Sequence, residues 1–110
     1  MADLKRADLA LRAERAVLCQ VVSVEDRSDA DETFEELEAL ARNAGARVIG
    51  GLRQKRTQPD PRYYVGKGKL AELKRCCDTA EADVVVCDDE LSPNQVKVLE
   101  SHLGVKVVDR

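Results

Sequence analysis

The chain has 110 residues, enough for one domain with a core of its own. Its 44% hydrophobic and 35% charged residues are ordinary for a soluble globular protein. No apolar run approaches the roughly 20 residues of a membrane span. Charges interrupt the N-terminus where a signal peptide would be apolar, so we expect a cytoplasmic protein without a membrane span.

Strand and helix patterns alternate along the chain. We expect an N-terminal tail or helix over residues 1–15 and an α/β domain over residues 16–110. Apolar runs predict strands at 16–24, 46–54, 83–89 and 105–109, and amphipathic spacing predicts helices at 32–45, 69–82 and 92–103. The expected fold is a small, doubly wound, mainly parallel four-stranded sheet of order 2-1-3-4, with helices on both faces.

The last predicted helix has a clear start. Ser92 is the predicted N-cap, Pro93 takes the first helical position, and Gln95 completes a capping box. The acidic run 88–90 precedes it, at the carboxyl end of a strand, where α/β sheets place ligand sites. These carboxylates could hold magnesium or supply a base, but we favour a structural role at the helix start.

No catalytic or metal-binding arrangement is evident among the cysteines and the histidine. The four cysteines lie in apolar or helical stretches without metal-ligand spacing, so we expect them to be reduced and structural. His102, the only histidine, has no partner for a catalytic dyad and is expected on the surface or at a helix end. We predict no catalytic residues and no metal ligands in this chain.

Basic residues are concentrated between residues 53 and 69. This segment holds six basic residues and one acid, a local charge of +5, whereas the remainder holds 12 basic and 20 acidic residues, a charge of −8. Two tyrosines accompany the basic residues, and RNA-binding proteins combine such groups to neutralise phosphate and to stack on unpaired bases. Alternatively, the tyrosines pack beneath the loop. The candidate RNA contacts are Arg53, Lys55, Arg56, Arg62, Tyr63, Tyr64, Lys67 and Lys69.

The same segment contains a strand, a glycine-lysine turn and a helix start, an arrangement typical of phosphate-binding loops. It departs from the P-loop G-x-x-x-x-G-K-[ST], because Tyr63 stands at the first glycine position and Leu70 at the hydroxyl position. Backbone amides at this helix start could still hold a phosphate weakly. We expect Gly66 and Gly68 to shape a turn, and we expect no cofactor in this chain.

Two stretches resemble a known family: "RQKRTQPDPRYYVGKGKLAEL" and "CDDELSPNQVKVLESHLGVKVVDR" are similar to the N-terminal domain of HflX-type GTPases. The resemblance implies an N-terminal domain followed by a helical segment and a GTPase domain, which would carry GTP and magnesium. Members of this family bind the large ribosomal subunit, and some split ribosomes into subunits. The chain itself is therefore expected not to be an enzyme.

This resemblance makes a ribosome-contacting domain, bound to rRNA of the large subunit, our preferred function. Its other expected partners are the helical and GTPase domains of the same protein, and we expect a monomer or weak dimer. Two alternatives stay open: a small nucleotide-binding module using the amides of residues 66–69 and Asp88, and a structural spacer that positions the GTPase domain.

Overall fold

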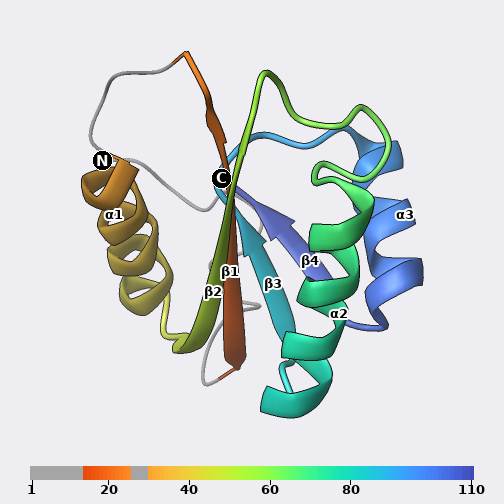
Figure 1. Cartoon of the computed structure of the whole chain (residues 1–110). Helices are drawn as coiled ribbons and strands as arrows, with labels where there is room; N and C mark the ends of the chain where they lie inside the picture. Colours follow the sequence, from red (N-terminus) through yellow and green to blue (C-terminus); the bar gives the residue numbers. More distant parts are fainter. Residues whose placement is uncertain (1–13, 26–29) are drawn as a thin grey trace.

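A computed structural model describes residues 14–25 and 30–110. The predicted N-terminal tail or helix lies almost wholly outside these residues. The elements, in chain order, are β1 (Arg15–Ser23), α1 (Ala30–Asn43), β2 (Arg47–Arg56), α2 (Lys67–Ala80), β3 (Val84–Cys87), α3 (Pro93–Leu103) and β4 (Lys106–Asp109) (Figure 1).

The strands form one four-stranded sheet in the order β2-β1-β3-β4, as the sequence predicted. All three strand pairs are parallel, so the sheet is entirely, not only mainly, parallel. A helix connects each strand to the next one along the chain. Parallel strands need such a crossover connection. The doubly wound α/β fold is confirmed.

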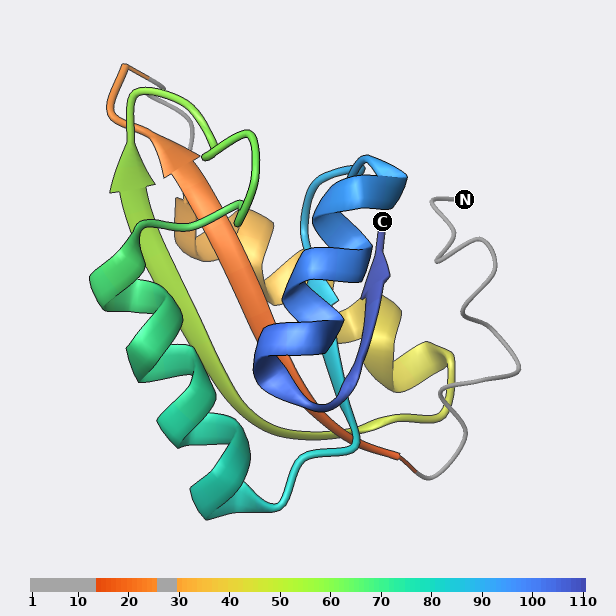
Figure 2. The same ribbon diagram turned by 90° about the vertical axis from the view of Figure 1, so that its right-hand side faces the viewer.

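Helices cover both faces of the sheet and create two apolar cores. Figures 1 and 2 show α1 on one face and α2 with α3 side by side on the other. On the α1 face, Leu37 and Ala41 pack with Leu18 and Val86 of the central strands. The opposite core is larger and contains the following buried residues: Val17, Cys19, Tyr64, Val65, Leu70, Leu73, Cys77, Val85, Cys87, Leu91, Leu99, Leu103 and Val107.

Two predicted boundaries near the basic segment are wrong. The second strand was expected to end at residue 54, but β2 continues through Arg56, because the long strand β1 pairs Val22 with Lys55 and Ser23 with Arg56. Helix α2 starts at Lys67, not at Lys69, so Gly68 lies within its first turn. The segment is therefore a strand end, a loop over 57–66 and a helix start.

Other local predictions hold. Ser92 accepts a hydrogen bond from the Gln95 amide, and the Gln95 side chain accepts one from the Ser92 amide, which confirms the capping box. All four cysteines are free thiols, and three of them are buried. Within the described residues, no helix combines the length and apolar character needed to cross a bilayer.

Candidate nucleic-acid interface

The sheet divides the basic residues of β2 between its two faces. A Cβ added at Gly51 would meet Phe34 of α1, whereas one added at Gly50 would meet Cys76 of α2. Because side chains alternate along a strand, Arg53 and Lys55 share the α1 face and Arg56 lies on the α2 face. The predicted contacts are therefore not one continuous surface.

Two of the predicted contacts are neutralised within the domain. The Arg53 guanidinium pairs with Asp31 at 2.6 Å and lies 5.1 Å from the Phe34 ring centroid. Lys69 pairs with Glu72 at 2.7 Å, one helical turn further along α2. An ion pair within the domain competes with a phosphate for the same cation, so these residues are the weaker candidates.

Three predicted cations are exposed and form no ion pair with any described acid: Lys55, Arg62 and Lys67. Arg56 is partly covered, and its Nε donates to the Gln58 carbonyl at 3.0 Å. Lys55 ends β2, Arg62 lies on the loop and Lys67 starts α2. The unneutralised charge of the segment therefore follows the chain from the end of one strand to the beginning of a helix.

Tyr64 does not offer a stacking surface, which corrects the prediction for this residue. Its side chain is only 1% exposed and belongs to the larger core. The hydroxyl donates to Asp89 Oδ2 at 2.7 Å and accepts from the Val21 amide at 3.1 Å. Burial raises the pKa of this phenol well above its usual range, with smaller contributions from Cys87 and Asp89, so Tyr64 remains neutral. The alternative of a tyrosine packed beneath the loop holds here.

Tyr63, in contrast to Tyr64, is partly accessible to solvent. Its ring is half-buried, with the Arg62 guanidinium 5.1 Å from the centroid and the His102 ring at 6.4 Å in an edge-to-face arrangement. The charge of Arg62 over the ring is a cation–π contact. Tyr63 therefore remains a candidate for stacking, and His102, predicted at the surface near a helix end, is its neighbour in the exposed last turn of α3.

Asp60 fixes the loop that carries Arg62 and Tyr63. Its carboxylate accepts the amides of Arg62 at 2.8 Å and Tyr63 at 2.7 Å, and these bonds hold its pKa below the ordinary value. Its backbone exchanges two hydrogen bonds of 3.0 Å with Tyr64, which adopts a left-handed φ of 67°. Such a φ is unusual for a bulky residue, and the surrounding bonds hold it in place.

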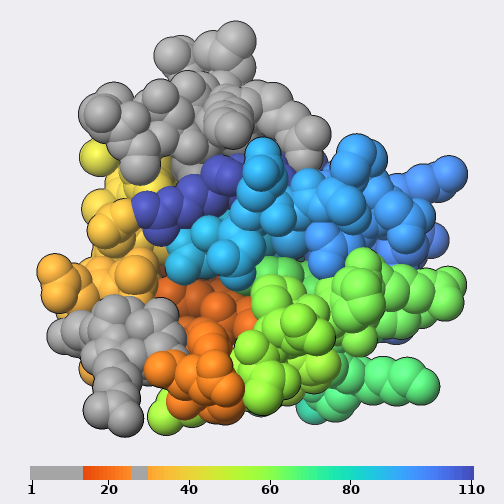
Figure 3. Space-filling view, turned by 90° about the horizontal axis from the view of Figure 1, so that it is seen from above, coloured from red at the N-terminus to blue at the C-terminus, as the bar shows by residue number. Residues whose placement is uncertain are grey.

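A side chain from α3 attaches this loop to the helix. Gln95 Nε2 donates to the Asp60 carbonyl at 2.8 Å. Seen from the carboxyl ends of the strands, the loop (green) lies beside α3 (blue) (Figure 3). The loop and α3 therefore form one surface with a defined geometry.

The start of α2 is a weaker place for a nucleotide than its glycines suggest. Gly66 is the N-cap, and its amide already donates to Gln54 Oε1 at 2.9 Å. Gly68 lies in the helix and has open space where a Cβ would be, so the prediction that it shapes a turn is wrong. Leu70, at the position of a P-loop hydroxyl, is buried. These residues do not fit a magnesium nucleotide.

The acidic run 88–90 has structural partners. Asp88 accepts from Gln20 Nε2 at 2.9 Å and from Arg110 Nη1 at 2.7 Å, and Asp89 accepts from Tyr64. The bond to Asp88 raises the pKa of Arg110. Within the part of the chain that the structure describes, no three potential ligands are placed to hold a metal ion. Asp88 and Asp89 therefore have structural partners in β1, in the loop and at Arg110, and not at the helix start that was favoured from the sequence.

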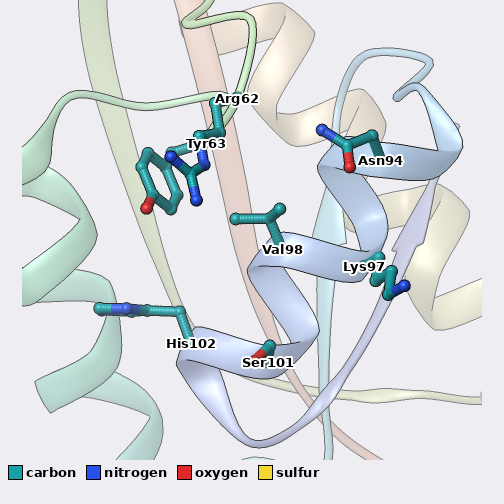
Figure 4. Close-up of a pocket in the computed structure, with 7 residues that line it drawn as sticks. All are labelled: Arg62, Tyr63, Asn94, Lys97, Val98, Ser101 and His102. Carbon is teal, nitrogen blue, oxygen red and sulfur yellow. The ribbon is translucent and has the colours of Figure 1, made fainter.

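Helix α3 lies beside the loop and contributes to the same surface, which was not expected from the sequence. Asn94, Lys97, Ser101 and His102 follow one face of the helix and line a pocket with Arg62 and Tyr63 (Figure 4). The spacing of Asn94, Lys97 and Ser101 by three and four residues was visible in the sequence, and His102 follows Ser101 directly. Nothing in the sequence, however, indicated that this face would meet a loop more than thirty residues earlier.

The sequence of this domain matches a known family. A family model described as "GTP-binding GTPase N-terminal" matches residues 31–110. The curated GTPase HflX of Caldanaerobacter subterraneus subsp. tengcongensis is 47% identical over 103 residues, covering 94% of this chain and 23% of that protein. The chain belongs to the HflX N-terminal domain family.

Two further relatives belong to the same family. The GTPase HflX of Lacrimispora saccharolytica is 42% identical over 97 residues, covering 88% of this chain and 23% of that protein. The GTPase HflX of Escherichia coli is 34% identical over 97 residues, covering 88% of the chain and 22% of that protein. The HflX N-terminal domain described here thus spans less than a quarter of these relatives. The family match includes the whole basic segment and α3.

Proposed function

We propose that this domain contacts RNA of the large ribosomal subunit and thereby positions an HflX-type GTPase on the ribosome. The observation that carries the proposal is a group of exposed cations that form no ion pair with a described acid, Lys55, Arg62 and Lys67, on a chain of net charge −3. An acidic body is repelled by RNA, so attraction must come from locally placed cations, here at a strand end, on a loop and at a helix start. A cation that is not ion-paired with an acid of the domain gives up no such pair when it binds phosphate.

In the full-length protein, contact with the ribosome and GTP hydrolysis would belong to different domains. The relatives are named GTPases, and this chain spans 23% of the first of them. Because the start of α2 does not fit a magnesium nucleotide, GTP binding and hydrolysis would take place in another domain. The N-terminal domain would supply contact with the ribosome in the cytoplasm, and the helical and GTPase domains would use that contact, for example to split ribosomes into subunits.

The two alternatives make different demands on these residues. A nucleotide-binding module would use the amides of residues 66–69 and Asp88. The Gly66 amide, however, is bound to Gln54, and Asp88 is bound to Gln20 and Arg110. A structural spacer would need no unpaired cations at all. These contacts favour the RNA-contacting function.

The test is binding of the domain to purified large ribosomal subunits over a series of salt concentrations. Replacing Lys55, Arg62 and Lys67 together with alanine should weaken binding and flatten the slope of log affinity against log salt by about one unit per lost contact. A control variant replaces the two ion-paired cations Arg42 and Lys74, which pair with Glu38 and Asp78 within their helices, and the two variants are compared per cation removed. Absence of binding by the unmodified domain, or equal effects in both variants, would contradict the proposal.

A further inference from the structure

A pocket of about 530 Å³ lies between the loop and α3 (Figure 4). The loop contributes Arg62 and Tyr63, and successive turns of α3 contribute the rest of the lining: Asn94, Lys97, Val98, Ser101 and His102. We call this space the α3 groove. Several of these side chains are exposed, so the groove is open to a large ligand.

None of the described residues that line the α3 groove is acidic, although the chain holds 21 acids among 110 residues. It has cations on both sides: Arg62 on the loop and Lys97 on the helix. Neither forms an ion pair with an acid in the described ranges. The lining is therefore complementary to an anion that reaches across the groove.

Between the cations, the lining offers flat and apolar surface. In Figure 4, Val98 and His102 extend from α3 towards the side on which Tyr63 lies. The Tyr63 and His102 rings are 6.4 Å apart with planes at 65°, so they form two walls of different orientation. Asn94 and Ser101 add exposed amide and hydroxyl groups that can donate and accept hydrogen bonds.

The two sides of the groove are held together before any ligand arrives. Gln95 links α3 to the Asp60 carbonyl, and the Asp60 carboxylate holds the amides of Arg62 and Tyr63. The side chain of Tyr64, the next residue, is anchored in the core. Little ordering of the backbone is then needed on binding, which favours affinity.

We propose that the α3 groove binds an unpaired segment of RNA, with a base against the rings of Tyr63 and His102 and phosphates near Arg62 and Lys97. Positive charge along a groove together with aromatic surfaces is how proteins bind single strands. A duplex keeps its bases stacked on one another and would leave the rings unused. This inference rests on the proposed function, because it specifies the kind of ribosomal RNA that the domain takes.

The test measures the fluorescence anisotropy of a labelled RNA of about ten nucleotides, which is within the usual site size for single strands. The same RNA annealed to its complement and free AMP serve as competitors. We expect the single strand to bind more tightly than the duplex and AMP to compete poorly. Equal affinity for strand and duplex, or strong competition by AMP at equal concentration, would overturn the inference.

Three variants assign binding to the groove. His102→Ala and Tyr63→Ala should each weaken single-strand binding by about 5- to 150-fold with little change in salt slope, as expected for lost stacking. Lys97→Ala should reduce the salt slope by about one unit. His102 and Lys97 are exposed, so their replacement tests the groove even if the Tyr63 variant is unstable. Lys74→Ala, on α2, is the matched control for the lost charge.

The two proposals can fail separately. If Lys97→Ala and His102→Ala leave single-strand binding unchanged, the α3 groove is not the RNA site, whatever the large subunit does. If the domain binds single strands through the groove but does not bind large subunits, the inference about RNA holds and the ribosomal function is wrong.

Discussion

The hydroxyl of Tyr64 donates to Asp89 at 2.7 Å and accepts from the Val21 amide at 3.1 Å. One buried phenol therefore joins the loop after β2 to the ends of β3 and β1. Its backbone, with φ at 67°, also exchanges two bonds with Asp60. The position of the loop thus depends on a residue that cannot itself reach a ligand.

Tyr64→Phe should destabilise the domain without removing any group from the proposed interface. The substitution leaves the half-buried Val21 amide without this partner, whereas the exposed Asp89 carboxylate can bond to water, so we expect a loss of about 1 kcal/mol. Urea unfolding followed by circular dichroism measures the change. RNA affinity, measured at a temperature where the variant is folded, should stay close to that of the wild type.

Tyr63→Phe is the matched control, because no hydrogen bond of the Tyr63 hydroxyl with a described residue is seen. We expect a change in unfolding free energy within about 0.5 kcal/mol. A Tyr64→Phe variant as stable as this control would mean that the two bonds contribute nothing to the fold.

Gly51→Ala and Gly50→Ala should differ although the residues are neighbours on β2. A Cβ at Gly51 would lie 2.4 Å from Phe34 Cζ, and the ring would have to move and disturb its contact with Arg53. We expect a loss of about 1–3 kcal/mol, as for other overpacked sites. At Gly50 the nearest atom is Cys76 Sγ at 3.5 Å, an ordinary contact, so alanine should be tolerated. Thermal unfolding of both variants compares their stability. Equal melting temperatures would show that the Phe34 side chain moves aside without loss of stability.

Asp60 should make loop stability depend on pH in the acid range. Hydrogen bonds from Tyr63 and then Arg62 lower its pKa from 3.8, so the folded state favours the carboxylate. This contribution is present above the unfolded-state pKa and is lost as the pH falls through the lower folded-state pKa. Asp60→Asn, which keeps an acceptor but not the charge, should cost roughly 1 kcal/mol near neutral pH.

That cost should shrink as the pH falls from about 6 to about 2, because the wild-type carboxyl becomes neutral as well. Unfolding of wild type and variant in parallel at each pH gives the difference. A constant difference over this range would mean that charge plays no part in holding the loop.

One cysteine should react readily in the folded protein. Cys19 and Cys87 are buried, burial raises the pKa of the Cys77 thiol to about 11, and only Cys76 is partly exposed. Hydrogen bonding to Cys19, and then burial, also raises the pKa of Cys87. A maleimide at neutral pH should therefore modify one thiol quickly, and all four only in urea.

Cys76→Ser should abolish the fast modification, and Cys77→Ser should leave it intact. Mass spectrometry of the intact protein counts the modified thiols. Rapid modification of more than one thiol in the native wild type would mean that the core opens far more easily than its packing indicates.

Much of the architecture followed from the sequence alone. The apolar runs and the capping box of Ser92 identified the strands and the start of α3, because short-range periodicity and capping chemistry act within a few residues. The alternation of strand and helix, with right-handed crossovers, then favoured the strand order that is found. The sequence also located the basic segment, because charge is visible without any structure.

Only the tertiary structure separated the members of that segment. In the folded domain Arg53 pairs with Asp31, and Lys69 pairs with Glu72. Tyr64 is buried, whereas Tyr63 lies beside His102. These contacts depend on which elements of the fold become neighbours, and side-chain type does not encode that. Two adjacent tyrosines therefore received opposite roles: a left-handed backbone turned one into the core, while the other remained at the surface against α3.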